Sequence, residues 1–256
     1  MAEIGIAGSP RAADRRTPGH VRVLLVIPAF NEAENLPAVI AEVREKCPAV
    51  DFVVINDGST DNTSAVARRL GARVLDCPIN LGIGGAVQCG IRFAFREGYD
   101  ICIQCDGDGQ HDPRWVADLV RPIVAGEADM VVGSRFLVRE GFQSTGLRRI
   151  GIRFLSEWIR WFSGQRVTDP TSGFRAIGRS LISEFSSRYP REYPEPESVY
   201  VALHRGYRLR EVHTIMRPRR SGCSSIQQLD SVLYILKICL AILADRFRDP
   251  RRVESE

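Results

Sequence analysis

The sequence predicts an α/β protein built on a doubly wound, mostly parallel sheet that is flanked by helices. Short apolar, β-branched runs alternate with amphipathic stretches of helical periodicity, in the order strand–helix four times and then a strand. Such an order requires right-handed crossovers and produces a parallel sheet. The chain has 256 residues, of which 44% are apolar and 26% are charged. These values are ordinary for a soluble globular protein.

Each expected element rests on a local pattern. The runs expected to form buried strands cover residues 21–27, 51–56, 73–76, 101–105 and 129–133. The helices expected between them, from apolar residues at helical spacing, cover residues 31–46, 59–70, 84–98 and 113–125. Ser59 or Thr60 can cap the second of these helices, and Gly71 can end it.

The pattern changes after residue 135. A helix is expected over residues 140–164 and a further helix within residues 174–188, and a weak alternation over 208–216 favours a late edge strand. The apolar run 231–244 is too short to span a bilayer, which takes about 20 mostly apolar residues. It therefore predicts an amphipathic C-terminal helix. The expected division is a disordered lead-in (1–19), a globular domain (20–226), and an amphipathic helix with a basic tail (227–256).

Charge and cysteine usage limit the partners and the compartment. The net charge of +4 is too mild to imply a nucleic acid partner, but arginines crowd into residues 135–153, 205–220 and 246–252. Such clusters favour phosphate groups or an anionic membrane surface. The seven cysteines lack zinc-ribbon spacing, and the one CxxC pair, Cys102 and Cys105, lies in an expected strand. We therefore expect reduced thiols in a cytoplasmic protein.

Polar loops follow four of the expected strands. They comprise residues 28–32, 56–59, 106–110 and 133–135. Ligands of open α/β sheets bind at the carboxyl ends of the strands, near the point where the strand order reverses. Four polar loops at one edge of the sheet therefore describe a binding site.

The loop 106–110, DGDGQ, carries the strongest chemical signal. Asp106 and Asp108 alternate along an extended segment, so both carboxylates can face one ligand, while Gly107 permits a close backbone approach. Two like charges so close together repel each other, and we expect a cation to compensate. Gln110 adds an amide oxygen, and such hard oxygen ligands suit Mg²⁺ or Mn²⁺. The alternative is an acidic turn that caps the next helix.

The remaining loops each allow two interpretations. Asp57 is either a cap or turn aspartate, or a carboxylate that accepts hydrogen bonds from a nucleobase or ribose. Glu32 is either a similar ligand group or a first-turn acid of a helix. Residues 80–86, NLGIGGA, lack the lysine and the spacing of a phosphate-binding loop. These residues fit the start of a helix packed closely against the sheet at least as well as they fit a phosphate-binding loop.

Six motifs, taken in order, carry a family resemblance. They are VIPAFNE (26–32), INDGSTDNT (55–63), NLGIGGAVQCGI (80–91), DGDGQHDP (106–113), VGSR (132–135) and DPTSGFR (169–175). Together they resemble the family 2 glycosyltransferases of the GT-A fold, especially the branch of dolichol- or polyprenyl-phosphate mannosyl- and glucosyltransferases. The resemblance runs from about residue 21 to about residue 226, which makes 20–226 the expected catalytic domain.

The resemblance implies inverting transfer from a nucleotide-diphospho-sugar, with Mg²⁺ or Mn²⁺ as the cofactor. By position, the residues that it assigns to the nucleotide-sugar pocket are Pro28, Phe30, Glu32, Asp57, Asp106, Gly107, Asp108 and Arg135. It makes Asp106, Asp108 and Arg135 catalytic, with Arg135 on the donor phosphates. It assigns the metal to Asp108 and Gln110.

The resemblance also implies phosphate contacts on an acceptor side. In the lipid-phosphate branch, an arginine on the helix after the sheet and a later R-x-x-G-x-S-K loop grip phosphates. Arg148 or Arg149 can fill the first role. In the loop 219–225 the arginine (Arg219), the glycine and the first serine match, but Ser225 stands where that branch has lysine. This departure leaves room for another sugar or acceptor.

The acceptor decides whether a base is needed. A phosphate is already ionised near neutral pH, whereas a sugar hydroxyl needs a positioned carboxylate. Glu195 and Glu197 are candidates for that base, and a surface turn bounded by prolines is their alternative role. The expected acceptor is a polyprenyl phosphate in cell-envelope glycan synthesis. The alternative acceptor is a hydroxyl of a polysaccharide or glycolipid.

Two helices allow either a core or a membrane-interface position. In the helix 140–164, apolar residues recur at helical spacing with arginines between them: Leu147, Ile150, Phe154, Trp158 and Trp161. The helix 231–244 has the same ambiguity and can also contact a second copy of the chain, which would make a homo-oligomer. We therefore expect a protein at the inner face of the membrane, attached peripherally or through a separate membrane protein.

Two other classes of protein fit less well. A sugar-phosphate nucleotidyltransferase would carry a glycine-rich loop with Arg and Lys after the first strand, where PAFNEAEN (28–35) stands instead. A non-catalytic, sugar-nucleotide-binding membrane scaffold would not need the intact DGD motif and Arg135.

Overall fold

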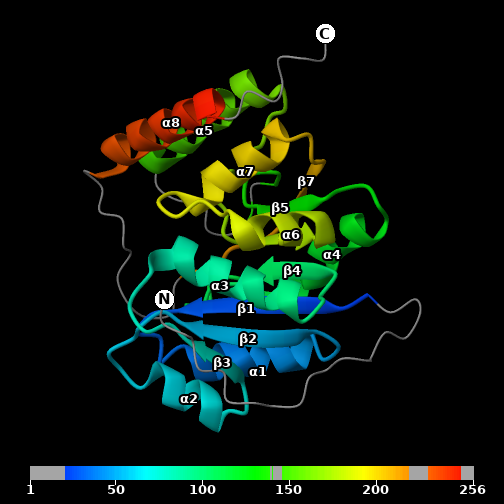
Figure 1. Ribbon diagram of the computed structural model, residues 1–256, viewed down its shortest axis with the longest axis vertical. Helices are drawn as coiled ribbons and strands as arrows, with labels where there is room; N and C mark the ends of the chain where they lie inside the picture. Colours follow the sequence, from blue (N-terminus) through cyan, green and yellow to red (C-terminus); the bar gives the residue numbers. More distant parts are fainter. Residues whose placement is uncertain (1–20, 139, 141–145, 219–229, 249–256) are drawn as a thin grey trace.

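A seven-stranded sheet in the order β3-β2-β1-β4-β6-β5-β7 forms the centre of the molecule. The computed structural model describes residues 21–138, 140, 146–218 and 230–248, and Figure 1 shows how their helices cover both faces of the sheet. Most neighbouring strands are parallel. The predicted α/β fold with a mostly parallel sheet is therefore confirmed.

The first part of the chain follows the predicted alternation of strands and helices. The strands β1 (Val23–Ala29), β2 (Asp51–Asn56), β3 (Arg73–Asp76) and β4 (Ile101–Gln104) are parallel, and between them lie α1 (Leu36–Lys46), α2 (Thr63–Arg69) and α3 (Gly82–Arg96). The helix predicted to begin at residue 31 begins at Leu36, because a turn precedes it. In that turn Asn31 has a φ of 56°, a left-handed conformation that asparagine tolerates better than most residues.

The second part also contains the expected late edge strand. After a 3₁₀ turn, η1 (Pro113–Trp115), come α4 (Val116–Val124), β5 (Met130–Ser134) and α5 (Gly146–Ser163). The later elements include α7 (Pro194–His204), β7 (Leu209–His213) and α8 (Asp230–Arg248). β7 is parallel to β5 and closes one edge of the sheet.

The further helix predicted within residues 174–188 is confirmed, and it forms the later part of that segment. Arg175–Gly178 forms the strand β6, and only Arg179–Ser187 forms a helix, α6. β6 is antiparallel to both of its neighbours, β4 and β5. All four residues of β6 are buried, so the segment is too short and too uniformly buried to show the alternation that identifies a strand.

The sheet separates two apolar cores. One lies between the sheet and α3, α5, α6, α7 and α8, and it includes Leu155, Phe185 and Tyr200. The other lies against α1, α2 and α4 and includes Leu36 and Leu119. α8 contributes fully buried isoleucines to the first core and packs against α5 and α7, so it is integrated with the main domain. The predicted lead-in (1–19) and the predicted boundary at 226–227 lie outside the described residues.

The strands on either side of β6 run in the same direction as the rest of the sheet. Because β6 is antiparallel to β4 and to β5, these two strands run the same way, and β7 follows β5. The carboxyl ends of all strands except β6 therefore meet at one edge of the sheet. This edge is where the four polar loops of the sequence lie.

Candidate active site

Hydrogen bonds join the loops after β1 and β2. The side-chain oxygen of Asn31 accepts from the backbone N–H of Thr60 at 2.9 Å, and the backbone N–H of Asn31 donates to Ser59 Oγ at 3.0 Å. The backbone N–H of Asp57 donates to Ala29 O at 2.9 Å. The two loops therefore form one rigid wall at the sheet edge.

Asp57 is buried behind this wall and anchors the start of α3. Its Oδ1 accepts from the backbone N–H of Leu81 at 2.7 Å. Burial raises the pKa of Asp57, while the N–H groups of Leu81 and Gly82 oppose that shift. The structure thus shows a helix-anchoring role, although for α3 rather than for the helix that follows Asp57 in sequence. The predicted contact of Asp57 with a nucleoside stays a prediction.

Glu32 lies in the turn before α1, so the alternative that made it an acid in the first turn of that helix is wrong. Its backbone N–H donates to Thr63 Oγ1 at 2.9 Å, and its Oε2 accepts from Asn35 Nδ2 at 2.5 Å. Nearby, the side chain of Phe30 is 46% exposed. Both residues thus remain at the open edge, where the nucleotide pocket was expected.

Gly107 lets the DGD loop approach β1 closely. Its N–H donates to Pro28 O at 3.3 Å, and a Cβ atom at this position would lie 3.1 Å from the same oxygen. That separation is tighter than ordinary van der Waals contact. The close approach that the glycine permits is therefore made by the backbone of Pro28, which brings the two motifs together.

The two carboxylates of the DGD loop occupy different environments. Asp108 is only 3% exposed, and its Oδ1 accepts from the backbone N–H of Gln110 at 3.0 Å. Asp106 is partly exposed, and its Oδ1 accepts from Gln104 Nε2 at 3.1 Å. The backbone N–H of Asp106 donates to Nδ1 of the buried His111 at 3.0 Å. The carboxylate of Asp108 is thus held within the loop, whereas the carboxylate of Asp106 is held by Gln104 on β4.

The oxygen donors of this loop fit a divalent cation that also binds a ligand. The carboxylate of Asp108 and the amide of Gln110 are hard oxygen donors on one short loop, with Asp106 beside them. Among the residues described, no group of three or more His, Cys, Asp or Glu side chains forms a complete metal cage. Mg²⁺ sites that rely on one or two carboxylates plus substrate phosphates have this composition.

The same loop pairs with the segment after β7. His111 and Met216 form an isolated antiparallel bridge. The backbone N–H of Arg217 donates to Gln110 O at 3.0 Å, and Gln110 Nε2 donates to Arg217 O at 3.2 Å. The segment that leads toward residues 219–229 therefore begins beside the predicted metal ligands.

A buried ion cluster holds this junction. The Asp112 side chain is 1% exposed and contacts Lys46 at 3.1 Å, Arg114 and Arg217, while Arg217 also contacts Glu42 at 2.7 Å. Burial alone would raise the pKa of Asp112, but the Arg114 N–H and the three cationic side chains hold it at about 2. The cluster connects α1 to the end of the DGDGQHDP motif and to the segment after β7.

Arg135 is turned toward a second acid. Its Nε and Nη2 donate to the two carboxylate oxygens of Asp169 at 2.6 and 2.7 Å, and Nη2 also donates to Thr171 Oγ1 at 3.0 Å. Burial by itself would lower the pKa of Arg135. The carboxylate of Asp169 outweighs this effect, so the pKa of Arg135 is raised above its usual value. Arg135 therefore positions the DPTSG loop, and the donor-phosphate contact implied for it stays a prediction.

The acceptor residues are less completely placed. Arg148 and Arg149 both lie in α5, and Arg149 is partly buried. Arg219 and Ser225 lie outside the described residues. The structure thus gathers the predicted donor residues at one edge of the sheet, whereas the convergence of the acceptor residues on that edge stays a prediction.

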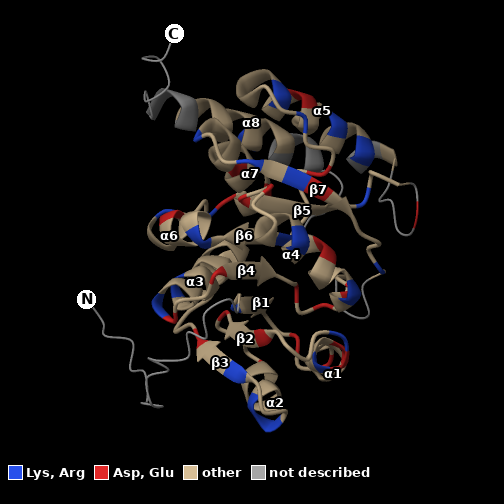
Figure 2. Cartoon of the chain, turned by 90° about the vertical axis from the view of Figure 1, so that its right-hand side faces the viewer, with Lys and Arg blue, Asp and Glu red and all other residues tan. Residues whose placement is uncertain are grey.

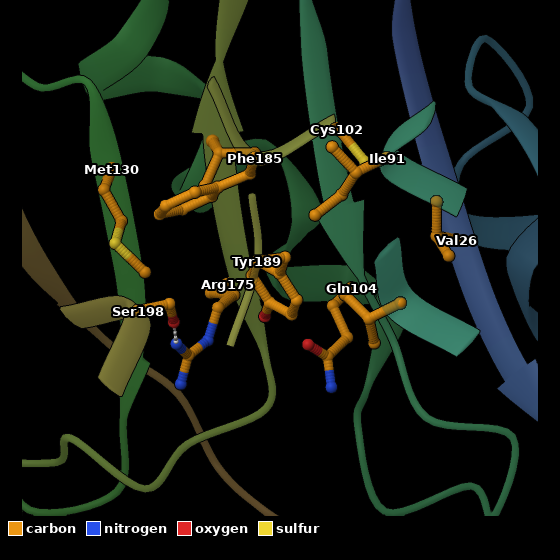
Figure 3. Close-up of a pocket in the computed structure, with 11 residues that line it drawn as sticks. Val26, Ile91, Cys102, Gln104, Met130, Arg175, Phe185, Tyr189 and Ser198 are labelled. Carbon is orange, nitrogen blue, oxygen red and sulfur yellow. Dashed lines mark hydrogen bonds between the residues drawn. The ribbon is translucent and has the colours of Figure 1, made fainter. Parts of the chain in front are cut away.

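A buried polar network behind Asp106 was not predicted. Gln104 on β4 pairs in register with Arg175 on β6, and both line a small cavity of about 20 Å³ (Figure 3). Arg175 Nη1 donates to Glu195 O at 2.8 Å and to Ser198 Oγ at 2.7 Å. The available signal was the spacing of Gln104 and Asp106, because residues two apart on a strand share a face.

Comparisons with known proteins agree with this arrangement. Residues 24–187 match the family described as Glycosyl transferase family 2. A polyprenol monophosphomannose synthase from Mycolicibacterium smegmatis is 30% identical over 230 residues, which cover 86% of this chain and 85% of that protein. An undecaprenyl-phosphate mannosyltransferase from Micrococcus luteus is 33% identical over 162 residues, covering 61% of this chain and 66% of that protein.

Solved structures share the fold. A glucosyl-3-phosphoglycerate synthase from Mycobacterium tuberculosis, in complex with Mn²⁺, uridine diphosphate and phosphoglyceric acid, has a TM-score of 0.65, with 88% of this chain and 78% of that chain covered. At 23% identity this likeness concerns the fold alone, and it confirms the expected GT-A fold. The fold and its edge site are those of a sugar-transferring enzyme. The chain belongs to glycosyl transferase family 2.

Proposed function

We propose that this glycosyltransferase moves a sugar from a nucleotide-diphospho-sugar to a polyprenyl phosphate, with inversion at the anomeric carbon. The observation that carries the proposal is the convergence of Glu32, Asp57 and the DGDGQ loop at one sheet edge. The acceptor is supported by the similarity to the polyprenol monophosphomannose synthase over most of both chains.

The residues of the site suit this chemistry. Asp108 and Gln110 would hold Mg²⁺ or Mn²⁺, which when bound neutralises charge on the leaving diphosphate. The wall formed by the loops after β1 and β2 would hold the nucleoside, with Phe30 exposed beside it. A phosphate acceptor is ionised near neutral pH and attacks without a base, so this reaction needs positioning rather than proton transfer.

An exposed apolar surface on α5 and α8 supports peripheral attachment to a membrane. Ile150, Phe154 and Trp161 on α5 are 65%, 50% and 80% exposed, and Leu236 and Leu240 on α8 are 53% and 64% exposed. We call these five side chains the α5–α8 face. The two helices pack on each other at one end of the molecule (Figure 1).

Basic residues accompany this face. Arg153 and Arg160 on α5 are exposed, and Figure 2 shows basic segments along this helix. Exposed aromatic and aliphatic side chains with arginines beside them suit the interface of an anionic membrane. Among the described residues, no helix is long and apolar enough to span a bilayer. We propose that the α5–α8 face lies on the inner surface of the membrane, where a polyprenyl phosphate is available.

The first test is a donor and acceptor screen. Radiolabelled UDP- and GDP-sugars are incubated with the protein, polyprenyl phosphate and Mn²⁺ or EDTA, and the product is extracted into organic solvent. We expect label in the organic phase only when both metal and polyprenyl phosphate are present. A water-soluble product made from a glycan acceptor would instead support the hydroxyl alternative. If no donor is consumed and none binds, the proposed function is wrong.

The second test concerns the membrane. The double variant Phe154→Ser/Trp161→Ser should sediment less with vesicles that contain anionic lipid than the unchanged protein does. The matched control is Ile79→Ser, which removes an apolar side chain that is 65% exposed next to the edge strand β3. Equal sedimentation of the double variant and the control would contradict the assignment of the α5–α8 face.

A further inference from the structure

The side chain of Glu211, on the edge strand β7, binds the loop that precedes β6. Its Oε2 accepts from the backbone N–H of Thr168 at 2.8 Å, and its Oε1 accepts from Thr168 Oγ1 at 2.8 Å and from the backbone N–H of Asp169 at 3.0 Å. Three donors on two successive residues thus converge on one carboxylate. Glu211 pairs in register with Val132 of β5, so the sheet fixes the place from which this loop is held.

A chain of hydroxyl groups supports the same contact. Ser134 Oγ lies 2.7 Å from Thr168 Oγ1, which donates its one proton to Glu211. Ser134 must therefore donate to Thr168, and Ser134 Oγ in turn accepts from the backbone N–H of Phe136 at 3.2 Å. Ser134 is fully buried. Each group of this chain is satisfied because Glu211 accepts at the end of it.

The residues after Asp169 turn back toward the DGDGQ loop. The backbone N–H of Ser172 donates to Asp169 O at 3.2 Å, which closes the turn. The ring of Phe174 then stacks on His111, with 4.9 Å between the ring centroids. The segment 169–174 is therefore anchored at both ends, to β7 at its start and to the end of the DGDGQ loop at its finish.

Within this segment, Gly173 lies directly against the side chain of Asp106. A Cβ atom at position 173 would lie 3.1 Å from Asp106 Oδ2, 3.0 Å from Gln104 Nε2 and 3.4 Å from His111 Cε1. The first two separations are shorter than ordinary van der Waals contact, so the backbone at Gly173 limits where this carboxylate can lie. Its other oxygen is held by Gln104. The position of Asp106 thus depends on the position of the segment 169–174.

We propose that Glu211 is a positioning residue for the donor site, and that it acts through Gly173 to hold the carboxylate of Asp106 in place. The inference rests on the proposed function, in which Asp106 contacts the nucleotide-sugar. β6 and β5 lie between β4 and β7 in the sheet. Glu211 therefore controls, from the edge strand, a side chain of the loop that follows β4.

The contacts that lead from Glu211 to Asp106 have two ends, and one variant disturbs each. Both oxygens of Glu211 accept from a backbone N–H, so in Glu211→Gln the new NH₂ group must face a donor and the loop must shift. In Gly173→Ala the bonds of Glu211 stay intact, but the added Cβ displaces the carboxylate of Asp106 by a few tenths of an ångström. The φ of Gly173 lies outside the left-handed region, so alanine adds no backbone strain.

Binding of a nucleoside diphosphate measures the displacement of Asp106. Dissociation constants of UDP and of GDP are determined by calorimetry in the presence of Mn²⁺, and the melting temperature of each variant is recorded. For the nucleotide that the unchanged protein binds, we expect Glu211→Gln and Gly173→Ala each to weaken binding about 10-fold, because a misplaced contact group loses most of its effect. Asp106→Ala should weaken binding at least as much.

A double-mutant cycle separates positioning from a general loss of stability. If Glu211 acts through Asp106, then Glu211→Gln causes no further loss of affinity in a protein that already carries Asp106→Ala. Losses that multiply in the double variant overturn the proposal. Unchanged affinity in either single variant overturns it as well. If Glu211→Gln does not fold, the same cycle with Gly173→Ala decides by the same two outcomes.

The matched control is Asp129→Asn. Asp129 and Arg208 form an ion pair at 3.1 Å between the residues that precede β5 and β7, at the amino ends of these strands. Its loss removes a carboxylate that joins the same two strands and should leave the affinity unchanged. A loss of affinity equal to that of Glu211→Gln would mean a general loosening of β7 and would overturn the proposal. Failure of both UDP and GDP to bind the unchanged protein overturns the proposed function itself.

Discussion

The two parts of the sheet hold their polar residues in different ways. We call β1–β4 with α1–α3 the donor half and β5–β7 with α5–α8 the acceptor half. In the donor half, backbone groups carry most of the connections, as between Gly107 and Pro28 and between Asp57 and Leu81. In the acceptor half, buried charges do so, as between Arg135 and Asp169. The fold of a region held by backbone contacts should therefore tolerate loss of a charge better than the fold of a region held by ion pairs.

The largest expected effect is on catalysis in the donor half. Asp108→Asn should lower kcat/KM by at least about 10³-fold, which is about 4 kcal/mol of transition-state stabilisation, because the proposed metal loses its carboxylate. The measurement is steady-state transfer over a range of Mn²⁺ concentrations, with the melting temperature recorded for each variant. Asp118→Asn, on the surface of α4, is the control. Full metal-dependent activity in Asp108→Asn would refute the metal assignment.

The next effect concerns stability in the acceptor half. Asp169→Asn should cost about 4 kcal/mol of unfolding free energy, because it leaves the buried guanidinium of Arg135 without its counter-charge. Urea denaturation followed by circular dichroism measures the cost. Asp129→Asn breaks a more exposed pair with Arg208 and should cost less than about 1 kcal/mol. Equal costs would show that burial of the Arg135–Asp169 pair does not add to its contribution to stability.

Packing in the donor half gives a comparable but smaller effect. Gly90 of α3 lies against β1, and a Cβ atom there would lie 2.2 Å from Val26 Cγ1. Gly90→Ala should therefore destabilise the protein by about 3 kcal/mol, since helix and sheet must separate. Gly146→Ala, at the start of α5 with no atom within 4 Å of the added Cβ, should cost nothing measurable by the same denaturation. If Gly90→Ala loses much less unfolding free energy than expected, α3 can move away from β1.

The smallest effect tests the connection between the halves. Because the folded-state pKa of Asp112 is about 2, below the 3.8 that is usual for an aspartate, ionisation of Asp112 favours folding. This contribution of about 2 kcal/mol is present above pH 4 and is lost as the pH falls from about 4 to about 2. Urea midpoints over that range should fall more steeply for the unchanged protein than for Asp112→Asn. If the urea midpoints of the two proteins fall equally with pH, the cluster around Asp112 adds no stability.

The sequence predicts the donor half well because its signals are local. Each strand is followed by its own polar loop and helix, so Asp106, Asp57 and Glu32 could be assigned to one edge without knowing any distant contact. The start of α1 at Leu36 was missed because the turn around Asn31 interrupts a helical pattern that appears continuous in the sequence.

The acceptor half depends on distant partners that a single sequence does not reveal. β6 is stabilised by pairing with strands on both sides, and its four residues carry no pattern of their own. The pairing of Arg135 with Asp169, and the bond from Arg175 to the backbone of Glu195, join residues from separate motifs. Their polar side chains suggested contacts with ligands, whereas in the structure several of these residues bind each other and stabilise the fold.

The antiparallel strand β6 also has a consequence for biosynthesis. β5 has its two sheet neighbours, β6 and β7, after it in the chain, so a nascent chain that has just completed β5 carries a buried-type strand with both edges open. Such edges are templates for aggregation. High contact order slows the closure of a sheet, and here the ribosome must deliver most of the polypeptide before the sheet can close. The architecture that places the two halves of the site together thus leaves a buried-type strand unpaired until β6 and β7 follow it in the chain.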